Sequence, residues 1–304
     1  MISENITSIN QNAFVNCKFT YINVDNNNSI YDSRDNCNSL IETATNNLII
    51  GSANSTIPNT VTSIRSSAFS GSDITIITIP NSIEQISDYA FNNCKSLTNV
   101  TISNGVTSIG SSAFNSCENL SNVNLPNTIT TINNRAFYGC ESFTSIVIPS
   151  SVTSISKEAF CSCNSVTSII VDSNNSTYDS RNNCNAIIET ATNTLIVGCK
   201  TTVIPNTVIS IGNNAFQQVE GLTSITIPSS VTSIGDVVFK DCRSLISITS
   251  LSTTTPTIQS NTFLGVKTSG TLYVPQGTTV TGYGSWMRTD DYYLGKYGWS
   301  IVEV

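Results

Sequence analysis

The sequence predicts an α/β solenoid: a right-handed superhelix of mostly short parallel β-strands, with short helical turns and two β-hairpin insertions. Two observations support this prediction. A unit of 23 residues with fixed apolar positions recurs along the chain, and a longer unit occurs twice. Repeats of about 20–29 residues build solenoids, because one unit cannot bury its apolar face alone and must stack on its neighbours.

A phenylalanine marks the register of each unit. Its successive spacings are 22, 23, 23 and 23 residues in one block, then 23 and 24 in a second block. We expect these rings to lie in the core, and we expect Phe14 to open the chain in the same role. The marker residues are Phe69, Phe91, Phe114, Phe137 and Phe160, then Phe216, Phe239 and Phe263.

Each element of the unit can be read from residues 97–121. Residues 97–102 end in period-two alternation, which predicts a short strand. A proline such as Pro126 follows this strand in most copies and should end it, because proline cannot donate to the ladder. Residues 106–109 predict a second short strand, and 111–114 predict a turn or two of helix behind a serine N-cap.

The longer unit spans residues 24–69 and again residues 171–216, with 30 of 46 positions identical at a constant offset of 147. In both copies two apolar runs flank a Thr-Ala-Thr-Asn segment. Apolar runs around a short polar connection are typical of a β-hairpin. We therefore expect each long unit to insert one hairpin into the solenoid.

The domain organisation follows from where the repeat stops. We expect residues 1–268 to form the solenoid and residues 269–304 to form a capping segment. The stretch from residue 271 to the end holds seven Tyr or Trp residues in 34 positions. These side chains would cover the apolar end of the last coil, as repeat arrays require; an aromatic recognition surface is the alternative.

Composition excludes several classes of partner. Charged residues make up 11% of the chain against about a quarter in typical domains, and the net charge is −7 with no basic run. This balance argues against nucleic acid and against anionic membrane surfaces. No apolar stretch is long enough to span a membrane.

The N-terminal residues predict an open coil. Residues 1–10 have neither the basic nor the apolar region of a secretion signal. Residues 6–9 match the second strand of the unit, so the chain begins inside a coil without a polar cap. We expect that upstream sequence has been removed or that another surface covers this end.

Most of the ten cysteines fall in one column. Cys17, Cys94, Cys117, Cys140, Cys163 and Cys242 each lie three residues after the marker phenylalanine. Val219 and Val266 fill the same slot elsewhere, which predicts an apolar interior position for reduced thiols. Cys37, Cys161, Cys184 and Cys199 lie outside the column; a Cys184–Cys199 disulfide is the most plausible bridge, and the sequence does not decide whether any of the four is bonded.

The sequence offers no catalytic constellation, so we predict no catalytic residues, no metal site, no cofactor and no enzymatic activity. The chain contains no histidine, which removes Ser-His-Asp and Cys-His nucleophile pairs. Residues 25–29 and 172–176 begin like calcium loops but lack the glycine and glutamate that such loops need. Polar turns built on asparagine are the simpler interpretation. Asp32 with Arg34, and Asp179 with Arg181, are expected to form local turn clamps.

The remaining candidate is a surface. Along the longer predicted strand, side chains alternate outward, and stacking would align the outward ones as a broad, uncharged, hydrogen-bonding sheet face. Such residues also suit any exposed strand, so a purely structural role is the competing interpretation. The predicted ligand-binding residues are Asn99, Thr101, Asn122, Asn124, Ser145, Val147, Ser168, Ile170, Ser224, Thr226, Ser247 and Thr249.

Residues 79–102, 125–148 and 227–248, together with the long unit at 178–199, resemble the BspA-like leucine-rich repeat family over nearly the whole chain. The resemblance implies a leucine-rich-repeat solenoid that is secreted or attached to a cell surface, and some members are adhesins. It implies a protein or glycan ligand on host or neighbouring cells, and no shared catalytic motif. The open N-terminal coil would allow self-association. The alternative is a structural or receptor-binding component of a larger assembly, such as a phage particle, with a virion location.

Overall fold

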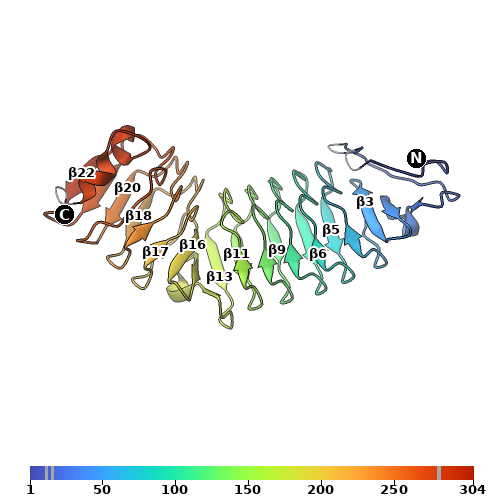
Figure 1. The fold of residues 1–304 in the computed structure, drawn as a ribbon, viewed down its shortest axis with the longest axis horizontal. Coiled ribbons are helices and arrows are strands. Elements are labelled where there is room, and N and C mark those ends of the chain that lie inside the picture. The colour runs from blue at the N-terminus through green and yellow to red at the C-terminus, as the bar shows by residue number, and fades with distance from the viewer. Residues whose placement is uncertain (11–12, 15–16, 279–281) are drawn as a thin grey trace. The chain divides into compact units, whose positions relative to one another are not determined.

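The computed structural model describes residues 1–10, 13–14, 17–278 and 282–304. Its backbone contacts divide the chain into two compact units: an N-terminal unit, residues 1–143 with 151–160, and a C-terminal unit, residues 144–150 with 161–304. Each unit is a stretch of β-solenoid built mostly from short parallel strands (Figure 1). Among the described residues, no helix combines the length and the apolar character that crossing a membrane requires.

The N-terminal unit carries a ladder of longer strands, made of β5 (Ile76–Ile79), β7 (Asn99–Ile102) and β9 (Asn122–Asn124). Neighbouring strands pair in parallel and in register. In β5 and β7, buried and exposed residues alternate, as the period-two pattern predicts. The proline rule is confirmed, because β5 ends directly before Pro80 and β9 ends two residues before Pro126.

A second ladder of two-residue strands runs along the same unit and confirms the second predicted strand. It consists of β6 (Gln85–Ile86), β8 (Ser108–Ile109), β10 (Thr131–Ile132) and β12 (Ser154–Ile155). All pairings between these strands are parallel. Exposed threonines reinforce the stacking: the Thr130 hydroxyl donates to the Thr107 carbonyl of the preceding coil at 3.2 Å.

Both predicted hairpins are present. In the N-terminal unit β2 (Ser39–Glu42) pairs antiparallel with β3 (Asn47–Gly51), and in the C-terminal unit β15 (Ala186–Glu189) pairs antiparallel with β16 (Thr194–Gly198). The sequence did not predict a third antiparallel strand, β1 (Tyr31–Asp32) or β14 (Tyr178–Asp179), followed by the 3₁₀ helix η1 (Arg34–Asn36) or η2 (Arg181–Asn183).

The second arm of each hairpin joins the solenoid. β3 pairs in parallel with β4 (Ser63–Ile64), and β16 pairs in parallel with β17 (Ser210–Ile211). The arm ends in a glycine because it lies directly on the core: a Cβ added to Gly198 would lie 2.2 Å from the Phe216 ring. The hairpin therefore replaces one ordinary coil of the short-strand ladder.

The C-terminal unit repeats these ladders. β11 (Ser145–Ile148) pairs with β13 (Ser168–Val171), and β17 pairs with β19 (Ser233–Ile234). A four-stranded parallel sheet follows, in the order β18 (Ser224–Ile227), β20 (Ser247–Ser250), β21 (Thr271–Val274) and β22 (Ser300–Glu303). The last two strands extend the sheet beyond residue 269, where the repeat pattern ends.

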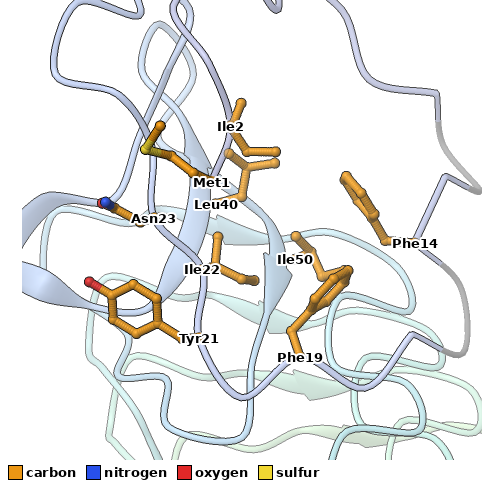
Figure 2. A pocket seen from close by; sticks show the side chains of 9 residues that line it. All are labelled: Met1, Ile2, Phe14, Phe19, Tyr21, Ile22, Asn23, Leu40 and Ile50. Carbon is orange, nitrogen blue, oxygen red and sulfur yellow. The ribbon is translucent and has the colours of Figure 1, made fainter.

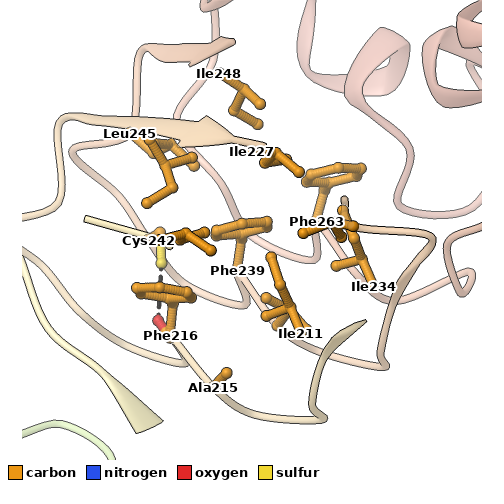
Figure 3. Close-up of a cluster of buried hydrophobic side chains, with 14 of the residues drawn as sticks. Ile211, Ala215, Phe216, Ile227, Ile234, Phe239, Cys242, Leu245, Ile248 and Phe263 are labelled. Carbon is orange, nitrogen blue, oxygen red and sulfur yellow. Dashed lines mark hydrogen bonds between the residues drawn. The ribbon is translucent and has the colours of Figure 1, made fainter. Parts of the chain in front are cut away.

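The marker phenylalanines form stacked columns in the core. In the N-terminal unit the rings from Phe69 to Phe160 lie nearly parallel, with centroids 4.8–5.4 Å apart. In the C-terminal unit Phe216, Phe239 and Phe263 stack at 5.6–5.7 Å (Figure 3). The expectation for Phe14 was wrong: it is only partly buried, and it meets Phe19 edge to face.

The cysteine column is confirmed in the interior coils. The thiols there are buried and reduced, namely those of Cys94, Cys117, Cys140 and Cys242. Each donates a hydrogen bond to the phenylalanine carbonyl of the coil before it at 2.9–3.3 Å. Figure 3 shows this bond between Cys242 and Phe216. Burial raises the thiol pKa of Cys94 and of Cys242 to about 12 and holds that of Cys117 well above its usual range.

Two members of the column do not fit. Cys17 is exposed and Cys163 is only half-buried. A buried column thiol donates to a phenylalanine carbonyl of the neighbouring coil, and within the described ranges Cys17 makes no such contact. The four cysteines outside the column are buried, and Cys184 and Cys199 are both reduced, so the suggested disulfide between them is absent.

The predicted helical turn at residues 111–114 does not form. The N–H of Ala113 bonds within the coil to the Gly110 carbonyl at 3.2 Å, but the N–H of Phe114 donates to Ala136 in the next coil at 2.8 Å. Because alternate N–H groups are directed to the neighbouring coil, the bonds of an α-helix cannot propagate. The helices of the described chain are four short 3₁₀ segments, among them η3 (Tyr283–Met287) and η4 (Leu294–Tyr297).

This turn ladder requires residues with positive φ. The position two before the marker phenylalanine lies in the left-handed region at Ser67, Tyr89, Ser112, Arg135, Asn214 and Val237. Four residues later the same conformation recurs, with glycine in three coils (Gly71, Gly139 and Gly265). The abundance of Ser, Asn and Gly in these turns follows from the backbone conformation.

The largest aromatic side chains after residue 270 are internal. Trp286 and Tyr283 are fully buried, and Trp286 lies 5.6 Å from the ring of Phe263. The indole N–H of Trp299 donates to the Lys267 carbonyl at 2.8 Å. Within the described part of this segment, which lacks 279–281, the largest rings therefore continue the core of the last coil.

Candidate functional site

The predicted sheet-face residues of the N-terminal unit lie in register on two neighbouring strands. Asn99 of β7 is paired with Asn122 of β9, and Thr101 is paired with Asn124. All four side chains are exposed, because the alternate positions of both strands turn toward the core. Their amide and hydroxyl groups form a two-by-two block of hydrogen-bonding side chains.

The C-terminal unit carries two further blocks. On β11 and β13, Ser145 lies opposite Ser168 and Val147 lies opposite Ile170. On β18 and β20, Ser224 lies opposite Ser247 and Thr226 lies opposite Thr249. Ser168, Ser247 and Thr249 are half-buried and the other five are exposed. The structure thus brings the twelve predicted residues together as three blocks, and their role in binding stays a prediction.

The sequence reasoning missed residues that extend these blocks. Ile76 and Thr78 of β5 pair with Asn99 and Thr101, and Tyr273 of β21 pairs with Thr249. Ile76 and Thr78 belong to the coil with 22-residue spacing, and Tyr273 lies beyond the last regular unit. The alternating pattern of both strands was the signal that could have found them.

One cross-strand pair on this surface is apolar. Val147 and Ile170 are 54% and 52% exposed, and each lies two residues after a serine on the same face of its strand. Their equivalents in other coils are Thr101, Asn124, Thr226 and Thr249. An exposed apolar pair inside an uncharged polar surface resembles the centre of a protein interface, where apolar contacts supply affinity and the polar rim supplies orientation.

The calcium-like segments form polar turns, as expected. The Asp25 carboxylate accepts the Asn27 N–H at 2.9 Å, and the Asn28 side chain accepts the N–H of Tyr31 at 2.8 Å. Asp172 and Asn175 repeat this arrangement in the sister unit. Within the described ranges no three Cys, Asp or Glu side chains are grouped so that they could hold a metal ion.

The paired Asp and Arg residues act as clamps between two loops. Arg34 binds both oxygens of the Asp32 carboxylate and also reaches Asn46 in the hairpin loop at 2.7 Å. Burial alone would raise the pKa of Asp32, but its hydrogen bonds and charge contact with Arg34 lower the pKa overall. Arg181 binds Asp179 and Asn193 in the same way, so this geometry belongs to the fold of the long unit.

The N-terminal coil contains a small apolar pocket of about 70 Å³ (Figure 2). It lies between the strand bridge of Ile2 with Val24 and the hairpin residues Leu40 and Ile50. Tyr21 at its rim is 64% exposed. Self-association through this end remains a prediction.

These features define a parallel leucine-rich-repeat solenoid whose accessible strands carry uncharged side chains. A family model for the BspA type leucine rich repeat region, present in six copies, matches residues 1–94, 47–167, 84–194 and 194–291. The chain belongs to the BspA-type leucine-rich repeat family.

Solved structures share the fold. A leucine-rich cell surface protein of Faecalibacterium prausnitzii is 25% identical, with a TM-score of 0.54 over 82% of this chain and 78% of that one. The pneumococcal vaccine antigen PcpA is 15% identical, with a TM-score of 0.55 over the same shares, and this likeness concerns the fold alone. No curated protein sequence matches the chain significantly.

Proposed function

We propose that the protein is a non-enzymatic binding module of a secreted or cell-surface protein, and that it presents its exposed sheet face to a protein or glycan ligand. The observation that carries this proposal is the register of the outward residues. Parallel pairing places like side chains opposite one another in every block, from Asn99 with Asn122 to Thr226 with Thr249. A ligand can therefore make several similar contacts at once.

The chemistry of the face supports binding rather than catalysis. Its twelve predicted residues carry hydroxyl, amide and aliphatic groups, none of which titrates near neutral pH. Such groups bind uncharged hydrogen-bonding surfaces without the desolvation cost of ions. The family and the cell surface protein of Faecalibacterium prausnitzii support a surface location.

Solid-phase binding tests the proposal. Purified protein is applied to wells coated with collagen, fibronectin, laminin, fibrinogen or mucin, and to a printed glycan array. The proposal predicts saturable binding to at least one of these surfaces. Absence of binding across the whole panel would contradict it, and so would turnover of a panel ligand.

A further inference from the structure

A shallow polar hollow of about 400 Å³, wide open to solvent, lies on the N-terminal unit beside β4 and β6. The side chains that bear on its chemistry are Asn47, Ser63, Arg65, Gln85, Ser87 and Asp88. They come from three successive short strands and the residues that follow them, on the second ladder and not on the proposed sheet face.

The hollow coincides with an interruption of the short-strand ladder. In the described chain the sheet that contains β3 ends at β4, and the next sheet begins at β6. Here the Ser87 hydroxyl, and not a strand backbone group, reaches the Ile64 carbonyl at 2.5 Å. The hollow therefore lies at a gap in the backbone ladder.

The sister unit provides an internal comparison. There β17 and β19 are paired, and the Gly235 N–H donates to the Ile211 carbonyl at 2.9 Å, so the ladder is continuous. The positions equivalent to Asn47, Arg65, Gln85 and Ser87 hold Thr194, Gly212, Ser233 and Gly235. The larger polar groups occur only in the copy in which the ladder opens.

Hydrogen bonds fix two of the groups that line the hollow, Asn47 and Asp88. The Asn47 amide oxygen accepts the Ser63 hydroxyl at 2.9 Å, which leaves the amide N–H groups of Asn47 as donors. The Asp88 carboxylate accepts the Ser111 N–H at 2.6 Å through one oxygen. Arg65 forms no ion pair within the described ranges. One cation and one anion balance the charge of the hollow.

We propose that this hollow is a second binding site, separate from the sheet face, and that it takes a neutral saccharide. The guanidinium and amide groups donate to sugar oxygens, and the carboxylate accepts from a pair of sugar hydroxyls. Because the charges of Arg65 and Asp88 balance, the hollow has no net charge that would attract an acidic sugar, and this favours a neutral one.

Affinity electrophoresis against several polysaccharides tests this inference. Native gels contain laminarin, yeast mannan, xyloglucan or soluble starch, with polygalacturonate as the acidic comparison. At least one neutral polysaccharide should retard the wild-type chain. Arg65→Ser should raise the Kd at least about tenfold, the value of one charge-assisted contact, and Gln85→Ser should raise it about threefold or more, the value of one neutral hydrogen bond. Adding Asn47→Thr to both should abolish retardation.

These substitutions are chosen to leave the fold intact. Serine occupies the Arg65 position at Ser156 and the Gln85 position at Ser233, and threonine occupies the Asn47 position at Thr194. Arg243→Ser removes an exposed cation elsewhere and should leave retardation unchanged.

Three results would overturn the inference: no retardation by a neutral polysaccharide, retardation by polygalacturonate alone, or equal retardation of the triple variant. None of these three results bears on the proposed sheet face, because its ligands are tested in separate coated wells and with separate variants.

Discussion

The thiol of Cys117 donates a hydrogen bond to the carbonyl oxygen of Phe91 in the preceding coil, with 3.2 Å between sulfur and oxygen. The same carbonyl accepts the N–H of Cys94 within its own coil. The cysteine thus joins two coils while filling an apolar slot. This dual role explains why cysteine is frequent in the column although valine also fits there.

The thiols should react according to their position in the stack. Folded protein treated with a thiol reagent at neutral pH should label promptly at Cys17 and remain protected at Cys94, Cys117, Cys140 and Cys242. Burial excludes the reagent from all four, and the raised pKa of Cys94, Cys117 and Cys242 keeps those thiols protonated. Denaturation without reductant should expose all ten thiols. Mass mapping of labelled peptides is the measurement, and protection of Cys17 would contradict the structure.

Alkaline pH should weaken the fold through these same thiols. The folded pKa of Cys94 is about 12 and the ordinary value is 9.0, so between these values the unfolded chain binds fewer protons. The stability supplied by the neutral thiol is complete below pH 9 and is lost as pH rises toward 12. Urea unfolding at pH 8 and pH 10.5 should show this loss, and Cys94→Val should reduce it. An equal loss in the variant would exclude this thiol as the cause.

Truncation of one stacked ring should create a costly cavity. Phe137 is 1% exposed and stacks on Phe114 and Phe160 at 5.4 Å. Phe137→Ala should lower the free energy of unfolding by about 3–5 kcal/mol. Tyr21→Ala, at a ring that is 64% exposed, serves as the control and should change stability by less than about 0.5 kcal/mol. Chemical denaturation measures both, and a wild-type curve for Phe137→Ala would show that the ring is not in the core.

One coil carries backbone strain that can be relieved. Val237 has φ 49°, in the left-handed region, where a β-branched side chain is disfavoured. Asn214 occupies the equivalent position of the previous coil. Val237→Asn should therefore stabilise the protein by about 1 kcal/mol. Val302→Asn, on extended strand backbone, should not stabilise it; thermal unfolding of both variants decides, and a lower Tm for Val237→Asn would contradict the argument.

The sequence predicted the features that depend on side-chain burial. The stacked marker rings, the two strands per coil and both hairpins follow from apolar periodicity, which the core enforces. The turn at residues 111–114 could not be predicted in this way, because neighbouring coils compete for its N–H groups. The exposure of Cys17 likewise depends on whether a neighbouring coil covers its side chain, which the local sequence pattern does not show.

The two candidate sites also differ in how far a local sequence pattern predicts them. Outward positions such as Asn99 and Thr226 follow from strand alternation, and the structure places them in register. The hollow beside Arg65 depends on two strands that separate, and it draws on residues from three coils. No local sequence pattern indicates that β4 and β6 are unpaired. The difference is seen when this long unit is compared with its sister, in which β17 and β19 pair.

The central claim, that the sheet face binds the ligand, is tested most directly at its exposed apolar pair. The double variant Val147→Thr, Ile170→Thr carries at both positions the side chain found in equivalent coils at Thr101 and Thr226. It should keep the wild-type Tm because both positions are more than half exposed. Ile209→Thr, a change of an exposed apolar residue directly before β17, serves as the control. On the coated surface that binds the wild-type chain, the double variant should bind at least about tenfold more weakly, by the loss of one apolar hot spot. Equal binding of the double variant and the wild-type chain would contradict the claim.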